Sequence, residues 1–230
     1  MEVLFEDKDI IVVKKEAGIA TQTAKCGEKD LVSEIKGYLY DKSAGNGEPY
    51  LGVIHRLDQP GEGILAFAKN PSASKNLSEQ VREGQMTKEY RAVVCGRVEP
   101  GIHTLVDYLK KDAKSNTSIV TSVKEKNAKR AELAYQLCPG ERSVQGANSI
   151  QEELHLVKID LYTGRHHQIR VQMAHAGIPL LGDRKYGKPV EGYHGGVNLC
   201  ACRLALKHPG TMEKLEFTIC PTNLQMYSEI

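Results

Sequence analysis

Short runs of β-forming residues recur along the whole chain, and they constrain its fold more than any other feature of the sequence. The runs are rich in Val, Ile, Leu and Tyr, and turns containing Gly, Pro, Asn or Asp separate them. We predict strands at residues 3–6, 10–14, 63–70, 88–98, 131–138, 152–162, 199–206 and 214–220. Helical spacing of apolar residues predicts helices at 30–41 and 166–176. A helix at 70–84 is predicted because Asn70 suits a helix cap and Pro71 suits the first turn.

Because strands outnumber helices and few β–α–β alternations occur, this pattern indicates an α+β protein. We expect a mixed, largely antiparallel sheet flanked by helices and loops. No linker divides the 230 residues convincingly, so we predict a single catalytic domain over 1–230. Residues 110–130 are polar and poorly periodic, which predicts an irregular excursion from the sheet.

Charge and cysteine content limit the class of protein. The formal net charge of +2 is too small to indicate a nucleic-acid partner by itself. Basic residues nevertheless gather in one stretch, at Lys110, Lys111, Lys114, Lys124, Lys126, Lys129 and Arg130. Such a cluster can neutralise phosphates, although a solvated polar loop would have the same composition.

The six cysteines are scattered without CxxC spacing, which argues against a disulfide framework and against a structural zinc site. They are Cys26, Cys95, Cys138, Cys200, Cys202 and Cys220. No stretch resembles a signal peptide or a membrane span. We therefore expect a cytoplasmic protein that does not associate with membranes.

The segment HRLD, residues 55–58, lies between two apolar runs, and Pro60, Gly61 and Gly63 force a turn directly after Asp58. A carboxylate at such an edge between strand and loop can be held at the floor of a cleft. An isolated Asp before Pro and Gly is more often only the start of a turn. This segment by itself therefore does not identify Asp58 as catalytic, and only other parts of the sequence can support that role.

Residues 164–187 contain a second polar cluster, in which the histidines and arginines of GRHHQIR surround a predicted helix start. Arg170 follows His166 and His167 by one helical turn, so the three are expected on one helix face. Such a face can bind phosphate or pair with a buried carboxylate. A solvated basic face would show the same periodicity.

Together, these segments resemble the RluA-type pseudouridine synthases. The segments that carry the resemblance occur in the family's order: EDKDIIVVKKEAGIATQ, HRLD with its turn and FAK, KEY, GRHHQIRVQMAHAGIPLLGDRKYG and RLALKHP. The resemblance spans nearly the whole chain. Because it begins in the first residues, we expect the chain to lack the small N-terminal RNA-binding domain of many relatives.

The resemblance implies an isomerase that converts specific uridines of structured ribosomal or transfer RNA to pseudouridine, as a monomer and with neither cofactor nor metal. It assigns Asp58 as the nucleophile, acting after the base has flipped out of the RNA, and Tyr90 and Arg170 as further catalytic residues. Substrate contacts are expected from neighbouring polar residues, namely His55, Arg56, Arg165, His167 and Gln168.

The chain departs from the family's pattern at four places, which bear on substrate contacts more than on the chemistry. Gly61-Glu62 replaces Thr-Ser, Lys15-Glu16 replaces Lys-Pro, His166 replaces Thr, and Cys200 replaces His.

Three other interpretations remain. Residues 182–188 match the phosphate-loop spacing GxxxxGK, but Pro189 stands where Ser or Thr would hold magnesium. A non-catalytic RNA-binding protein could keep the same fold, but binding alone would not require Asp58, Tyr90 and Arg170. A metal site could draw on the histidines, although none forms the HExxH pattern: His155, His166, His167 and His175.

Overall fold

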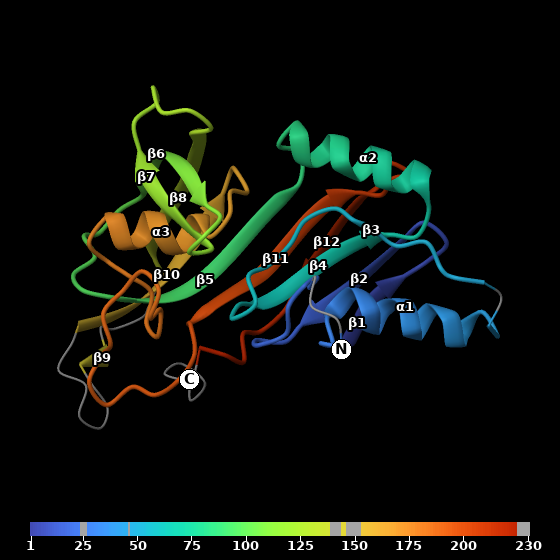
Figure 1. The fold of residues 1–230 in the computed structure, drawn as a ribbon, viewed down its shortest axis with the longest axis horizontal. Helices are drawn as coiled ribbons and strands as arrows, with labels where there is room; N and C mark the ends of the chain where they lie inside the picture. Colours follow the sequence, from blue (N-terminus) through green and yellow to red (C-terminus); the bar gives the residue numbers. More distant parts are fainter. Residues whose placement is uncertain (24–26, 46, 139–143, 146–152, 225–230) are drawn as a thin grey trace. The chain divides into compact units, whose positions relative to one another are not determined.

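The computed structural model describes residues 1–23, 27–45, 47–138, 144–145 and 153–224. The chain divides into two compact units, whose elements are labelled in Figure 1. The first unit comprises Met1–Thr87 and Ala201–Pro221, and the second comprises Lys88–Cys200 and Thr222–Ile230. That the two act as a single catalytic domain over 1–230 stays a prediction.

The first unit is built on strands from both ends of the chain. These are β1 (Glu2–Glu6), β2 (Ile10–Lys15), β3 (Gly52–Val53), β4 (Glu62–Ala68), most of β11 (Leu199–Lys207) and β12 (Lys214–Thr218). Their order is β1-β2-β4-β11-β12, with β3 paired to β4. The registers of β1–β2, β2–β4, β3–β4 and β11–β12 are all antiparallel. Every residue of β4 is buried, so this strand lies at the centre of the unit's core.

Two helices with sequence-encoded starts complete the first unit. In α1 (Leu31–Lys42), Asp30 caps the first turn by accepting the Ser33 N–H, and the buried residues repeat at helical spacing. In α2 (Pro71–Arg82), Asn70 accepts the Ala73 N–H, and the proline occupies the first turn, where no donor is needed. Both predicted helices are confirmed. They could be predicted from sequence because caps and apolar spacing are local signals.

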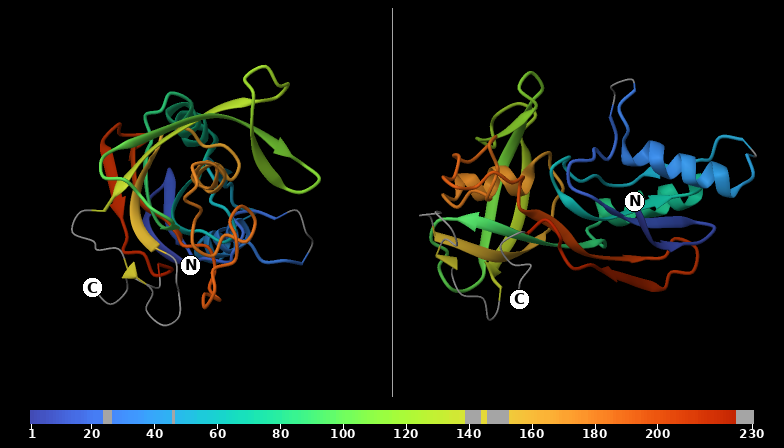
Figure 2. Two further views of the ribbon diagram at one scale, coloured as in Figure 1. Left: turned by 90° about the vertical axis from the view of Figure 1, so that its left-hand side faces the viewer. Right: turned by 90° about the horizontal axis from the view of Figure 1, so that it is seen from below.

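The second unit contains the remaining six strands of the described residues. Its strands are β5 (Thr87–Cys95), β6 (His103–Asp112), β7 (Thr117–Thr121), β8 (Lys129–Leu137), β9 (Val144–Gln145) and β10 (Glu153–Leu161). The order is β5-β10-β8-β6-β7, with β9 paired to β10, and every pair is antiparallel. The third helix, α3 (Gln168–His175), contacts β6 and β7 (Figures 1 and 2), with Val171 against Leu109 and Ala131.

The prediction of an irregular excursion over 110–130 is wrong. Residues 103–121 form the β6–β7 hairpin, in which Asp112 pairs with Thr117, and β8 begins at Lys129. Asn116, at φ 50°, allows the tight reversal between the two strands. Exposed strands with many lysines lack the alternation of apolar residues by which a strand is recognised in a sequence. Pairing with neighbouring strands stabilises them instead.

The α+β class and the largely antiparallel sheet are confirmed. Three helices accompany twelve strands in the described part of the chain. None of the described helices has the length and apolar character needed to cross a membrane.

Candidate active site

Asp58 lies in the connection from β3 to β4, at a tight turn. The Gly61 N–H donates to the Asp58 carbonyl at 3.0 Å, and Gly63, on β4, has φ 141°. A Cβ at Gly63 would lie 2.5 Å from the Cβ of Ala201 on β11, so a side chain there would push the two strands apart. The turn predicted after Asp58 is confirmed.

Both neighbours of Asp58 are bonded to the segment that follows β2. The Thr21 hydroxyl donates to the Leu57 carbonyl at 2.9 Å and accepts the Leu57 N–H at 3.2 Å. The Gln59 carbonyl accepts the Gly18 N–H at 2.8 Å, and its side-chain amide donates to the Gly18 carbonyl at 3.0 Å. The backbone that carries the half-buried Asp58 is therefore held from both sides.

Lys15, the last residue of β2, places a buried ammonium group between the segment that follows β2 and the turn at Asp58. Its Nζ donates to three backbone carbonyls, those of Glu16 (2.9 Å), Ile19 (2.7 Å) and Gln59 (3.2 Å). Burial lowers the pKa of Lys15 to about 8, against the opposing effect of the negative charges of Asp58 and Glu62. At neutral pH Lys15 is mostly charged, and this charge favours the ionised form of Asp58. Sequence reasoning missed this role, although a lysine inside the apolar run IIVVKK was a usable signal.

Glu62, one of the departures noted in the sequence, is almost fully buried. Its Oε1 lies 2.9 Å from the Nζ of Lys14, which forms an ion pair between β4 and β2. This carboxylate therefore takes part in holding the two central strands together.

His55 and Arg56 precede Asp58 and differ in exposure. The Nε2 atom of His55 accepts the Ala66 N–H of β4 at 3.2 Å, which puts the proton of a neutral ring on Nδ1. Arg56 is exposed. Contact with RNA stays a prediction for both residues.

In the second unit, the Arg170 guanidinium on α3 forms a bidentate pair with Asp183. Nε lies 2.7 Å from Oδ2 and Nη2 lies 2.7 Å from Oδ1. The two residues are only 5% and 1% exposed, respectively. The sequence suggested phosphate or a buried carboxylate as a partner for this helix face, but it did not name Asp183.

His167 begins α3 in a backbone conformation that most side chains avoid, with φ 53°. Its ring stacks on that of His166 at a centroid distance of 3.7 Å. Burial and the neighbouring Arg170 guanidinium lower the pKa of His167 to about 3, so the ring is neutral at physiological pH.

Gln168 and Arg165 are both bonded to their surroundings at the start of α3. The Gln168 side-chain oxygen accepts from the Thr163 hydroxyl and the Arg165 N–H, and its amide donates to the Glu132 carbonyl. Arg165 is exposed, and its Nε donates to a carbonyl of β8. These bonds shape the turn before α3, and substrate contacts of either residue stay predictions.

The predicted site residues fall into two groups. His55, Arg56 and Asp58 lie in the first unit, whereas the second unit contains Tyr90, Arg165, His167, Gln168 and Arg170. Tyr90, on β5, is 5% exposed and pairs with Ile159 of β10. Since the proposed catalytic trio draws on both units, its assembly stays a prediction.

The structure contradicts a phosphate loop at 182–188. The N–H groups of Lys185 and Tyr186 donate to the Asp183 side chain, and that of Gly187 donates to the Asp183 carbonyl at 2.8 Å. A phosphate loop presents such groups to its ligand. No helix follows at residues 188–190.

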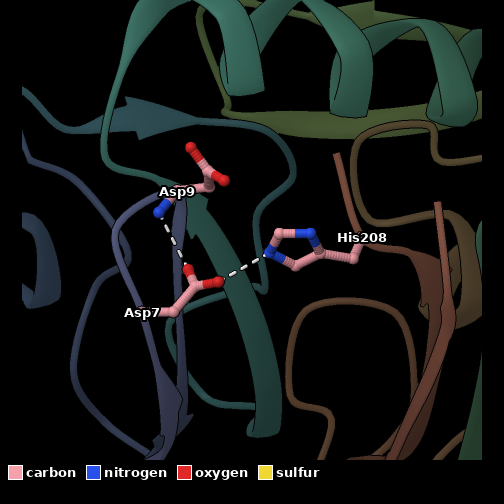
Figure 3. Close-up of side chains that lie close together, drawn as sticks. All are labelled: Asp7, Asp9 and His208. Carbon is pink, nitrogen blue, oxygen red and sulfur yellow. Dashed lines mark hydrogen bonds and ion pairs between the residues drawn. The ribbon is translucent and has the colours of Figure 1, made fainter. Parts of the chain in front are cut away.

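Among the described residues, one group of side chains lies close enough to hold a metal ion, namely Asp7, Asp9 and His208 (Figure 3). The Nδ1 of His208 accepts the N–H groups of Gly210 and Thr211, so Nε2 carries the ring proton and donates to Asp7 at 2.7 Å. Nδ1 thus closes the turn at 208–211 and Nε2 ties that turn to Asp7, which gives this group a structural role.

Comparison with known protein families gives a clear result. The family model described as RNA pseudouridylate synthase matches residues 9–175, which is more than half of the chain. The matched segment includes Asp58, Tyr90 and Arg170.

Individual relatives agree with this match. An uncharacterised RNA pseudouridine synthase of Bacillus subtilis is 32% identical over 218 residues, which cover 94% of this chain and 68% of the relative. The ribosomal large subunit pseudouridine synthase D of Zymomonas mobilis is 29% identical over 238 residues, covering 98% of this chain and 71% of that protein.

Solved structures show the same fold. Human RNA pseudouridylate synthase domain containing 1 aligns with a TM-score of 0.75 at 20% identity, covering 96% of this chain and 83% of the human chain. Human RNA pseudouridylate synthase domain containing 4 aligns with a TM-score of 0.73 at 20% identity, covering 97% and 90%.

Proposed function

The chain belongs to the RNA pseudouridylate synthase family, isomerases that act on RNA, and from this premise we propose that Asp58 is the nucleophile that converts specific uridines to pseudouridine. In this reaction the bond from ribose C1′ to N1 of uracil breaks, and a bond from C1′ to C5 forms. The C5 carbon loses a proton and N1 gains one. The atoms therefore balance without an oxidant, a reductant or a second substrate.

The observation that carries this proposal is the environment of Asp58. A carboxylate attacks only when ionised, yet a partly dry site raises its pKa. The buried Lys15 ammonium opposes that rise, and the hydrogen bonds at Leu57 and Gln59 hold the backbone in place.

Tyr90 and Arg170 are the proposed partners of Asp58. A uridine in structured RNA must leave its stack to reach a pocket, at a cost of a few kcal/mol. Stacking of the flipped base on the Tyr90 ring would stabilise the flipped state by about 1–3 kcal/mol. The buried Arg170 guanidinium would offset the desolvation of the nucleophilic carboxylate.

Contacts to the RNA backbone are proposed for two sets of residues. The basic side chains of β6, of β8 and of the turns on either side of β7 would neutralise phosphates at a distance along the RNA from the target base. Closer to the target, we propose contacts from His55, Arg56, Arg165, His167 and Gln168.

Ribosomal RNA is the first substrate to test, because the Zymomonas mobilis relative is named for the large ribosomal subunit, and transfer RNA is the second. We propose that the enzyme acts as a monomer in the cytoplasm. Buried cysteine thiols at Cys95, Cys138, Cys200 and Cys202 fit a reducing compartment.

The test is the Asp58→Asn variant, which keeps the shape of the side chain and removes its charge. RNA that carries tritium at C5 of uridine releases the label to water when the C1′–C5 bond forms. We expect this release to fall at least about 1,000-fold, because the nucleophile is lost, while RNA affinity in a filter-binding assay stays within about threefold.

The matched control is Asp41→Asn, an exposed aspartate of α1 in the same unit, which should leave tritium release unchanged. Substantial turnover by Asp58→Asn would refute the nucleophile assignment. If wild-type protein binds the RNA tightly yet releases no tritium from any ribosomal or transfer RNA, a purely RNA-binding function is favoured instead.

A further inference from the structure

We propose that Asp183 is a positioning residue for the isomerisation, which acts by fixing the direction in which Arg170 presents its guanidinium group. The inference rests on the proposed function, because that function assigns Arg170 to the reaction.

The geometry of the pair is the first argument. Asp183 takes the Nε and Nη2 edge of Arg170 through two parallel bonds of 2.7 Å each. Two bonds in one plane fix the orientation of the guanidinium as well as its place, which a single contact would not do. Because Asp183 holds this edge, it also sets the plane of the whole guanidinium group, including the position of Nη1.

The Asp183 carboxylate is itself held firmly. Its Oδ1 also accepts the N–H groups of Lys185 and Tyr186, at 3.0 and 3.3 Å. Just before it, Gly182 has φ 79°, and a Cβ there would lie 2.0 Å from the Gly196 carbonyl oxygen. The turn therefore has little freedom to move, and the two hydrogen bonds from Arg170 to Asp183 restrain the guanidinium group in the same way.

Tyr186 restrains the guanidinium from another side. The Arg170 guanidinium carbon lies 5.3 Å from the centre of the Tyr186 ring, within the range of a cation–π contact. The Tyr186 hydroxyl accepts the Ser118 N–H of β7 at 2.7 Å and lies 2.8 Å from Nδ1 of His167. The turn at 183–186 thus contacts Arg170 at one edge and one face, and β7 anchors the turn.

Stability alone does not account for this arrangement. A buried ion pair contributes little net stability, because desolvation of both charges offsets their attraction, and apolar replacements are often neutral or better. His167, whose backbone is in a disfavoured conformation, lies in the same cluster. Both features are common where a fold orients functional groups.

The consequence concerns rate more than binding. Transition-state stabilisation depends on direction, and a misplacement of about 1 Å can cost about 100-fold in rate. RNA affinity depends mainly on many phosphate contacts, to which one reoriented guanidinium adds little.

The experiment compares Asp183→Asn with wild-type protein under single-turnover conditions, using tritium release for the rate and filter binding for RNA affinity. We expect the rate to fall about 100-fold and the dissociation constant to change by less than about threefold. A rate within about threefold of wild type, in protein shown to be folded, would overturn the proposal.

A double-mutant cycle shows whether Asp183 acts through Arg170. The Arg170→Lys variant keeps a cation but cannot form the bidentate pair. If the role of Asp183 is to orient Arg170, adding Asp183→Asn to Arg170→Lys should lower the rate by less than about threefold further. An equal loss in both backgrounds would contradict the proposal.

Two controls separate positioning from folding. Leu156→Ala removes a buried side chain from the core of the same unit and should lower the melting temperature without lowering the single-turnover rate of the folded protein. Glu216→Gln disrupts a bidentate pair with Arg203 elsewhere, whose N–O distances are 2.8 and 2.9 Å, and should leave the rate unchanged.

Asp58→Asn, assayed in parallel, separates the two proposals. If Asp58→Asn stays active, the proposed function fails. If Asp58→Asn is inactive but Asp183→Asn turns over normally, only the positioning role fails.

Discussion

Lys15 carries a charge that the fold has removed from water. Three backbone carbonyls replace its hydration, and the negative charges of Asp58 and Glu62 offset part of the cost of burial. An ammonium group therefore persists where an isolated one would be neutral. Its pKa of about 8 still lies below the ordinary 10.5, so the folded protein gives up this proton more readily than the unfolded chain.

This difference predicts how Lys15 affects stability at alkaline pH. Between pH 8 and 10.5 the unfolded chain binds more protons at Lys15 than the folded protein does, so its contribution to folding stability rises with pH. We expect wild-type protein to gain up to about 3 kcal/mol over this window relative to Lys15→Met. Urea unfolding of both proteins at several pH values measures the difference.

The control for this prediction is Lys36→Met, because Lys36 is a partly exposed lysine of α1. Its stability difference from wild type should not change over the same window. If the curves for wild type and Lys15→Met run parallel from pH 8 to 10.5, the assigned pKa of Lys15 is wrong.

At the scale of elements, the β6–β7 hairpin combines a buried face with a basic outer surface. Leu109 and Ser118 are buried, whereas Lys111 and Lys114 are exposed. Val106 and Ile119 are also about half exposed, at 49% and 50%. A hairpin that leaves both cations and apolar side chains in solvent is suited to contact a partner such as RNA.

We predict that the triple variant Lys110→Gln, Lys111→Gln and Lys114→Gln binds RNA more weakly and with less dependence on salt. Each lysine that no longer neutralises a phosphate should reduce the slope of log affinity against log salt by about 0.7–0.9. Filter binding at several salt concentrations measures this slope. The melting temperature should stay near that of wild type, because these side chains are on or near the surface.

The matched control replaces three lysines of the first unit in the same way, Lys36, Lys75 and Lys207. This variant loses the same total charge, so it separates a local effect of the hairpin from a general charge effect. Equal slopes for the two triple variants would show that the hairpin has no special part in binding RNA.

At the scale of the whole molecule, each unit contains a group that should make folding sensitive to acid. In the first unit, burial would raise the pKa of Glu6, but hydrogen bonds from Lys42, Lys69 and Tyr38 lower it to about 2. In the second unit, burial and Arg170 lower the pKa of His167 to about 3. Both groups therefore bind protons more weakly in the folded protein than in the unfolded chain.

We predict that stability falls in two overlapping windows as pH decreases. His167 contributes a loss from about pH 6.5 down to 3, and Glu6 contributes a loss from about 4.5 down to 2, because the unfolded chain takes up these protons first. Thermal melts followed by circular dichroism between pH 3 and 7.5 test this. Glu6→Gln should flatten the decline below pH 4.5, and an unchanged decline would contradict the assignment.

Much of the fold follows from local patterns in the sequence. The caps Asp30 and Asn70, with the apolar spacing behind them, specify α1 and α2 without reference to the rest of the chain. Apolar runs likewise specify β2 and β4. The β7 strand escaped prediction because its short, half-exposed sequence forms a strand only when β6 pairs with it.

The sequence by itself determined the turn at Asp58 and the two helix caps, and the family's motifs in it suggested the residues that we propose for the chemistry. Only the tertiary structure decided the partners of those residues. Asp183 follows Arg170 by 13 positions, and Lys15 precedes Gln59 by 44, so no local pattern connects them. The physical reason is that hydrogen bonds and desolvation depend on which atoms meet in space, whereas caps and turns depend on neighbours along the chain.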